Sequence, residues 1–174
     1  MNTYEEIHEL AKQRLREAKL LLKEGHYNIA FYLAGYSIEL TLKAKICEHF
    51  NILDLFSEEN ISNNTNYLKE NDQKEQNEKI GKIIKIKNKI KEMVKIHDFD
   101  TLMLFCGLYS KYVKLSQITK EIYNNIILIN TWNTNIRYKK IGFITKEQAE
   151  NIILFLEEYE LENNKGLLQW IENN

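Results

Sequence analysis

The sequence contains no proline, only six glycines and only two cysteines in 174 residues. A fold of many short strands needs frequent turn residues, so the scarcity of proline and glycine argues against an all-β structure. Cys47 and Cys106 lack the spacing of a metal site and lie among apolar residues, which favours buried thiols. No stretch approaches the roughly 18 uninterrupted apolar residues of a membrane span. The length fits a single domain, residues 1–174.

The chain also lacks an excess of charge of either sign, because 24 Lys and Arg stand against 25 Asp and Glu. No global field therefore draws it to nucleic acid or to an anionic membrane, and any such contact needs a local patch. The first ten residues are acidic and amphipathic, unlike the charged start and apolar run of a signal peptide. We therefore expect a cytoplasmic protein that binds no membrane.

Apolar residues recur at three- and four-residue steps along most of the chain, which is the pattern of amphipathic helices. A capping box at Thr3–Glu6 predicts a first helix to about Lys23, and Gly25 stops it. The second helix is predicted over residues 26–50. It is apolar around most of its circumference, which is typical of a helix surrounded by neighbours.

The remaining segments complete an all-α prediction. Residues 57–78 are polar and weakly patterned, and we interpret them as a flexible surface insertion. Residues 79–95 fit a helical stripe and also strand alternation, and a helix is favoured. A short helix capped by Asp98 follows, then a long helix over 118–138 and a last helix over 145–170. The prediction is an up-and-down bundle of four to five helices, with the insertion between helices two and three.

Short signature elements carry a resemblance to a known family. They are Glu39 with Lys43-Ala44, His97-Asp98-Phe99 with Leu102, and Arg137-Tyr138. Together with the pattern of residues 14–44, and in this order, they make nearly the whole chain resemble HEPN-domain proteins. The resemblance implies a helical bundle that often homodimerises and is tied to nucleotides and RNA. It also implies a link to toxin–antitoxin or antiphage defence systems, often with a small nucleotidyltransferase encoded beside it.

Some members of that family are metal-independent RNases, which carry an Arg, four to six intervening residues and then a His. This sequence departs from the pattern. Its only arginines are Arg14, Arg16 and Arg137, and no His follows any of them at that distance. We therefore expect that the chain is not an RNase of the family's usual kind.

Glu39 and Lys43 lie one turn apart on the predicted central helix, where two buried charges must be paired. One interpretation is a structural ion pair, with Arg137 or Tyr138 as further partners. The other is a polar pocket in which Lys43 and Arg137 bind a phosphate and Glu39 orients them. Tyr138 is a further candidate for ligand binding. The sequence leaves these alternatives open.

Two other features are candidates for chemistry. His97 could act as a general acid or base, and Arg137 could assist it, because an ordinary His titrates near neutrality. The lysine run that includes Lys82, Lys85 and Lys89 is either solvated surface or a patch for a phosphate backbone. It lacks aromatic residues for base stacking. The histidines have no ligand-like spacing, so we expect neither a metal nor a cofactor.

These observations favour a non-catalytic module that forms a homodimer and binds a nucleotide, RNA or a partner protein. A minimal nucleotidyltransferase is one such partner. One alternative is a divergent metal-independent RNase that uses His97 and Arg137. Another is a purely structural, accessory subunit.

Overall fold

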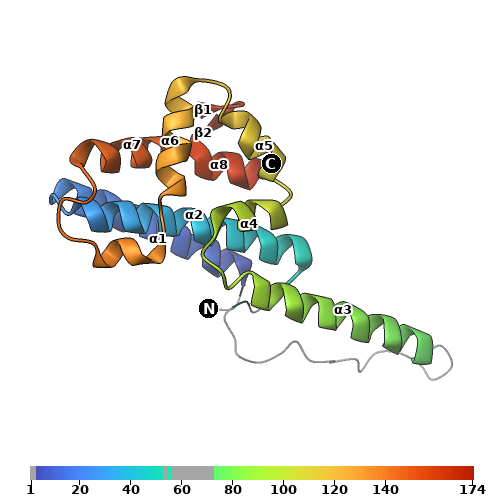
Figure 1. Cartoon of the computed structure of the whole chain (residues 1–174). Helices are drawn as coiled ribbons and strands as arrows, with labels where there is room; N and C mark the ends of the chain where they lie inside the picture. Colours follow the sequence, from blue (N-terminus) through green and yellow to red (C-terminus); the bar gives the residue numbers. More distant parts are fainter. Residues whose placement is uncertain (1–2, 53–54, 56–72) are drawn as a thin grey trace.

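The computed structural model describes residues 3–52, residue 55 and residues 73–174, and this part of the chain is mostly helical (Figure 1). The predicted all-α class is confirmed. In chain order the elements are α1 (Tyr4–Lys23), α2 (Tyr27–Phe50), α3 (Gln73–Met93), α4 (Phe99–Phe105), α5 (Tyr109–Leu115), α6 (Lys120–Asn130), the 3₁₀ helix η1 (Thr134–Tyr138), α7 (Lys146–Glu157), β1 (Glu160–Leu161), β2 (Asn164–Lys165) and α8 (Gly166–Asn173). Within these residues, no helix combines the length and the apolar character that crossing a membrane requires.

Helices α1 and α2 form a long pair that lies side by side (Figure 1). The predicted capping box is present, because Thr3 Oγ1 accepts the Glu6 N–H and the Glu6 carboxylate accepts the Thr3 N–H. At the other end Gly25 has a φ of 81°, and its N–H donates to the Leu22 carbonyl at 3.1 Å. Glycine takes this left-handed conformation without steric cost, so it reverses the chain into α2.

Helix α2 is the centre of the bundle, as predicted. It contacts α1, α4, η1, α7 and α8, and it is buried around most of its circumference. One contact is especially close: a Cβ added at Gly35 would overlap the indole ring of Trp132. The indole N–H donates to the Tyr32 carbonyl at 2.9 Å, which fixes the ring against this helix.

The predicted insertion over residues 57–78 falls mostly outside the described residues. Its last part was predicted wrongly, because helix α3 begins at Gln73. Residues 73–78 are Gln, Lys, Glu and Asn, and all but Asn have high helix propensity, which explains the earlier start. Residues 79–93 are helical, as favoured over a strand. Helix α3 projects away from the other helices (Figure 1).

The predicted long helix over 118–138 is broken in the structure. Helix α6 begins after Thr119, whose hydroxyl accepts the Ile122 N–H at 3.1 Å, and it ends at Asn130. The Asn133 side chain then accepts the Asn135 N–H at 3.0 Å and starts the separate 3₁₀ helix η1. A side chain that bonds its own backbone competes with helix continuation, and this gives the break its local cause.

The predicted last helix over 145–170 is also two helices. Between α7 and α8 the chain forms the hairpin β1–β2, in which Leu161 pairs with Asn164. The two loop residues, Glu162 and Asn163, have φ values of 49° and 71°, as a tight two-residue hairpin turn demands. Trp170 on α8 is fully buried, and its indole N–H donates to the Glu162 carboxylate at 2.9 Å.

Candidate functional site

Glu39 and Lys43 form an ion pair in the middle of α2, with Lys43 Nζ 2.7 Å from Glu39 Oε1. Their side chains are only 1% and 3% exposed, so the pair is enclosed by the protein. The third member is His97, in the loop before α4, whose Nδ1 lies 2.8 Å from Glu39 Oε2. The structure does not bring Arg137 or Tyr138 to this pair. We call Glu39, Lys43 and His97 the ion-pair cluster.

The ion-pair cluster is satisfied from within. Glu39 uses both carboxylate oxygens, since Oε1 contacts Lys43 and both oxygens lie within 3.0 Å of His97 Nδ1. Among the described residues, no buried side-chain nitrogen or oxygen lacks a hydrogen-bond partner. Neutralised, enclosed charges of this kind hold a helix in place. Because Lys43 is enclosed, a phosphate cannot reach it in this conformation.

His97 is the one member of the cluster that reaches the surface, with its side chain 51% exposed. Nδ1 faces the Glu39 carboxylate, while Nε2 makes no hydrogen bond to the part of the chain that the structure describes. The ring lines a pocket of about 80 Å³ together with Trp132 and Asn130. A carboxylate at Nδ1 orients the imidazole and leaves Nε2 open for proton transfer.

Arg137 lies in η1, is exposed, and is held by aromatic rings rather than by a carboxylate. Its guanidinium carbon is 4.9 Å from the ring centre of Tyr138 and 5.8 Å from that of Tyr32. Its Nη1 donates to the Tyr32 hydroxyl at 3.4 Å. Within the described ranges no carboxylate lies at ion-pair distance from it. Arg137 is therefore an uncompensated positive charge at the surface.

A row of stacked aromatic side chains lies between Arg137 and His97. Tyr32 stacks on Tyr36 with ring centres 6.2 Å apart and on Trp132 at 6.0 Å, and Trp132 stacks on Phe99 at 4.8 Å. We call these four residues the aromatic strip. Burial, then the charge of Glu39, raises the pKa of Tyr36, which places Tyr36 next to the ion-pair cluster. The strip thus runs from one candidate group to the other and keeps them apart.

The sequence interpretation missed Tyr32 and Tyr36. Their spacing of four residues, followed by Glu39 and Lys43 at further helical steps, puts all four on one face of α2. That spacing is the signal by which the tyrosines could have been found.

The chain after Arg137 is tied down by a single side chain, Asn28 of α2. Its Nδ2 donates to the carbonyls of Lys139 at 3.4 Å and Lys140 at 2.9 Å, and its Oδ1 accepts the Ile144 N–H at 2.9 Å. Lys139, Lys140 and Tyr138 are exposed, and Tyr138 has 75% of its surface free. We call Arg137, Tyr138, Lys139, Lys140 and Tyr32 the Arg137 surface.

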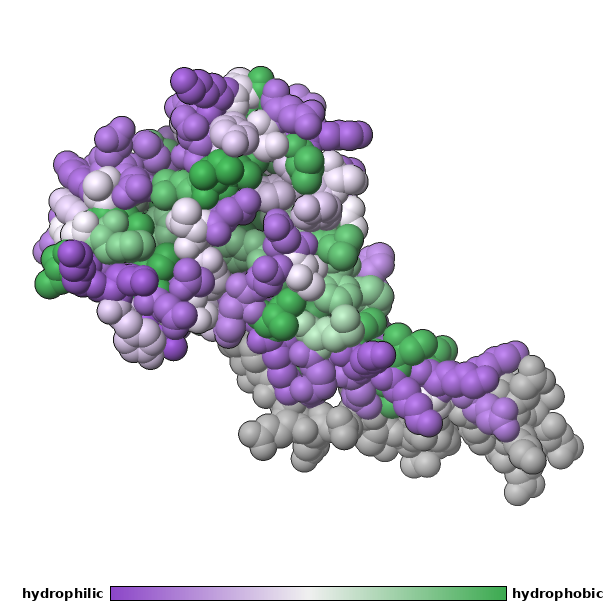
Figure 2. Space-filling view, viewed as in Figure 1, coloured by the Kyte–Doolittle hydropathy of each residue, from purple (hydrophilic) through white to green (hydrophobic). Residues whose placement is uncertain are grey.

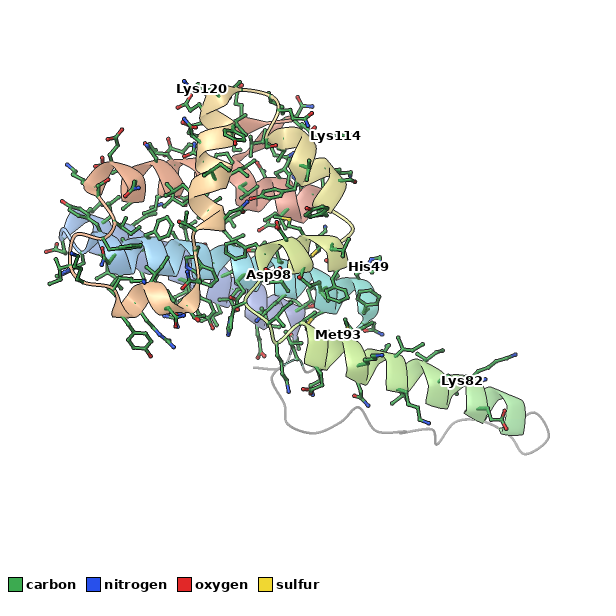
Figure 3. All side chains as sticks on the ribbon, viewed as in Figure 1. His49, Lys82, Met93, Asp98, Lys114 and Lys120 are labelled. Carbon is green, nitrogen blue, oxygen red and sulfur yellow. The ribbon has the colours of Figure 1, made fainter. Side chains whose placement is uncertain are left out.

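The predicted lysine patch lies elsewhere, on α3. Lys82, Lys85 and Lys89 are exposed, and Figure 3 labels Lys82 far out on this helix. Much of the visible surface of α3 is hydrophilic (Figure 2). Lys87 instead donates to the Asn51 carbonyl at 3.0 Å and so ties α3 to the end of α2. The patch and the Arg137 surface are well separated, since α3 and η1 lie at opposite sides of the molecule (Figure 1).

The cysteines give no reactive site. Burial raises the pKa of Cys47 and of Cys106 to about 12, so both thiols stay protonated at neutral pH. In the described ranges, no three His, Cys, Asp or Glu side chains are grouped so that they could hold a metal ion.

Comparison with known proteins gives one match. The family model of the HEPN domain matches residues 4–101, which include Glu39, Lys43 and His97 but not Arg137. No curated protein and no solved structure matches the chain.

Proposed function

This chain belongs to the HEPN-domain family, and from that premise we propose that it is a non-catalytic module that binds a nucleotide or RNA through the Arg137 surface. One observation carries the proposal. Arg137 is exposed, has no carboxylate partner among the described residues, and lies between the rings of Tyr32 and Tyr138. A free guanidinium flanked by aromatic rings matches the two parts of a nucleotide, its phosphate and its base.

The chemistry of each group supports this ligand. A guanidinium presents a planar fork of N–H donors that fits two phosphate oxygens. Tyr138 offers an exposed ring on which a base can stack, and such stacking tolerates any base. Lys139 and Lys140 add two further positive charges beside Arg137. Binding through such contacts weakens steeply as the salt concentration rises.

The arrangement of His97 supports the non-catalytic part of the proposal. Arg137 and His97 are the pair that an RNase interpretation would use, and the aromatic strip lies between them. His97 is bonded to Glu39 instead. A metal-independent RNase needs both groups at one phosphate, and this conformation does not supply that geometry.

The proposal is tested by fluorescence anisotropy with a labelled single-stranded RNA, and by calorimetry with ATP and GTP. We expect Arg137→Gln to weaken binding at least tenfold, because it removes a charge-assisted phosphate contact. Arg16→Gln is the matched control, since Arg16 is an exposed arginine on α1. Equal losses in the two variants, or no binding by the unmodified chain, would refute the proposal.

A second candidate is a divergent RNase that uses His97 and Arg137. The observation that favours it is the open Nε2 of His97, oriented by a buried carboxylate beside a pocket. Purified protein is incubated with labelled tRNA and mRNA in the presence of EDTA. Cleavage that disappears in both His97→Ala and Arg137→Ala would replace the non-catalytic proposal with this one.

We further propose that the module forms a homodimer and works with a minimal nucleotidyltransferase in a toxin–antitoxin or antiphage defence system. Light scattering is expected to give twice the mass of one chain. Co-purification with a nucleotidyltransferase encoded next to it tests the partner. If the chain is instead an accessory subunit that binds no ligand, calorimetry with ATP or GTP should give no binding heat, and anisotropy should show no RNA binding.

A further inference from the structure

A pocket of about 170 Å³ lies where α5 and α6 meet, with α4 at one end. Its walls combine aromatic rings, aliphatic side chains and polar groups; the aromatic and polar ones include Tyr109, Tyr112, Tyr123, Asn130 and Asp100. Helices α5 and α6 stand beside each other on the bundle (Figure 1). Apart from Asp100, the lining residues lie beyond residues 4–101, which match the HEPN model. None of them belongs to the Arg137 surface.

The carboxylate of Asp100 gives one end of this pocket a negative charge. Asp98, two residues earlier, caps α4 by accepting the Thr101 N–H at 2.7 Å, whereas Asp100 has no hydrogen bond or ion pair with any described residue. The Tyr112 hydroxyl donates to Asn130 Oδ1 at 3.2 Å. Burial, and then the Asp100 charge, raises the pKa of Tyr112, which places this charge near the tyrosine.

None of the lysines of α5 and α6 forms an ion pair with Asp100, and Lys111 instead donates to the Asn174 side chain at 3.1 Å. Figure 3 labels Lys114 and Lys120 at the far ends of these helices and Asp98 near the opposite end. Along α6, Lys120 and Asn130 are ten residues apart, which corresponds to about 15 Å. Asn130 lines the pocket together with Asp100, so the negative end of the pocket lies away from Lys120.

We propose that this pocket binds a small organic ammonium ion with a short aliphatic chain. The faces of tyrosine rings attract cations, and Asp100 supplies the counter-charge. The aliphatic part of the wall, Val113, Ile126 and Ile127, accommodates the chain of the ligand. The volume is below the ~300 Å³ typical of the smallest sites for drug-sized ligands, so one short chain fits. A phosphate is repelled by Asp100, so this site takes a different ligand class from the Arg137 surface.

The test is a titration of the full chain with n-butylammonium chloride, followed by amide shifts in ¹H–¹⁵N spectra. We expect saturating shifts in α4, α5 and α6, with a Kd on the order of millimolar because the ligand has few atoms. The matched neutral probe is n-butanol, which has the same chain without the charge. It is expected to bind at least tenfold more weakly.

Variants separate the charge from the rings. Asp100→Asn keeps the shape of the side chain and is expected to weaken n-butylammonium binding at least tenfold. Tyr123→Leu keeps an apolar surface but removes a ring, and is expected to weaken binding severalfold. If Asp100→Asn does not fold, the Tyr123→Leu variant tests the proposal in its place. Glu147→Gln, which removes an exposed carboxylate on α7, is the control and should bind normally.

Three results would overturn the proposal: equal binding of n-butanol, full affinity in Asp100→Asn, or no saturating shift at all. Arg137→Gln should leave n-butylammonium binding unchanged. Failure here is thus distinguishable from failure at the Arg137 surface, because the two tests use ligands of opposite charge and different variants.

Discussion

The ion-pair cluster and the Arg137 surface both contain charged side chains that pack against residues of α2, but the charges are compensated in one region and open in the other. In the cluster, Glu39 lies against Lys43 and His97, and two of the three side chains are enclosed. At the surface, Arg137 is held only by tyrosine rings and a hydroxyl. An enclosed charge whose partners come from the chain itself stabilises the fold. An open cation that lacks a counter-ion is free to bind one.

The aromatic strip separates the ion-pair cluster from the Arg137 surface. Trp132 fits directly against Gly35, so its ring fills the space on α2 through which Arg137 would have to approach Glu39. Of the two alternatives for the pair, the pocket that joins Lys43 and Arg137 on one phosphate is not formed in this structure. The contacts indicate that the two regions are independent, and substitutions in each region can test this.

The largest effect is expected for Lys43→Met. It leaves the Glu39 carboxylate buried without its cation, which typically costs about 3–5 kcal/mol of unfolding free energy. Urea denaturation followed by circular dichroism measures the loss. Lys45→Met is the control on the same helix, since Lys45 is partly exposed and donates to the Glu172 carbonyl rather than to a carboxylate. A loss below about 1 kcal/mol in Lys43→Met would contradict the structural role of the pair.

Gly35→Ala is expected to come next. The added methyl group would overlap the Trp132 indole, and overpacking of this kind costs about 1–3 kcal/mol. Thermal unfolding and tryptophan fluorescence report the loss and the displacement of the ring. Gly81→Ala is a matched control, because a Cβ at Gly81 meets nothing within 4 Å and alanine favours a helix. If Gly35→Ala is as stable as the unmodified chain, the Trp132 ring moves to accommodate the methyl group at little cost in free energy.

In contrast to Lys43→Met, Arg137→Gln is expected to affect ligand binding and leave stability almost unchanged. Its unfolding free energy should change by less than about 0.5 kcal/mol, because an exposed residue without an ion pair contributes little. Its RNA affinity should fall, and the slope of log affinity against log salt should decrease by about one. Anisotropy titrations at several salt concentrations measure the slope. A strong loss of stability would mean that the Arg137 surface is structural after all.

The smallest effect concerns Asp98, the cap that follows His97. Hydrogen bonds from the Thr101 side chain and backbone lower the pKa of Asp98 below its ordinary 3.8. The carboxylate form is therefore the stabilising one. Its contribution is complete above the ordinary pKa and is lost as the pH falls through the lowered pKa.

Asp98→Asn keeps a capping oxygen but does not titrate, so its unfolding free energy should lack this acid dependence. The difference between the two proteins should stay below about 1 kcal/mol, as for other helix caps. Denaturation at pH values from about 6 down to about 2.5 measures it. A cap contribution that grew on acidification would show that the protonated form is the one that binds the backbone.

The sequence predicted those parts of the fold that neighbouring residues decide. The helix starts at Thr3, Asp98 and Thr145 follow from side chains that bond backbone groups three residues away. The turn at Gly25 is equally local. The central position of α2 follows from its apolar circumference alone.

The breaks after α6 and α7 could not be predicted in the same way, because the apolar period continues across both. The Asn133 side chain gives the first break a local cause, and packing contributes to both breaks: Trp132 lies against Gly35, and Gly166 is so close to Leu156 that a Cβ would overlap its carbonyl oxygen. These contacts between segments are visible only in the structure, so the sequence alone could not place the ends of the two helices.

The same distinction applies to the candidate site. The Glu39–Lys43 pair was predictable because the two residues are one helical turn apart. Its third member was not, since His97 is 58 residues away from Glu39 in the chain. Arg137 was one of the partners that the sequence allowed for the pair. With η1 separated from α6, Arg137 packs on Tyr32 instead.

The triple hydrogen bond of Asn28 has a consequence for affinity. A surface loop that is ordered only on binding loses conformational entropy at that moment, and this loss subtracts from the affinity. Asn28 fixes both ends of the loop that follows Arg137 in the free protein. The ordering cost is thus met during folding, and the lysines of this loop are held in place before any ligand binds. One amide at the start of α2 therefore sets how rigid the Arg137 surface is.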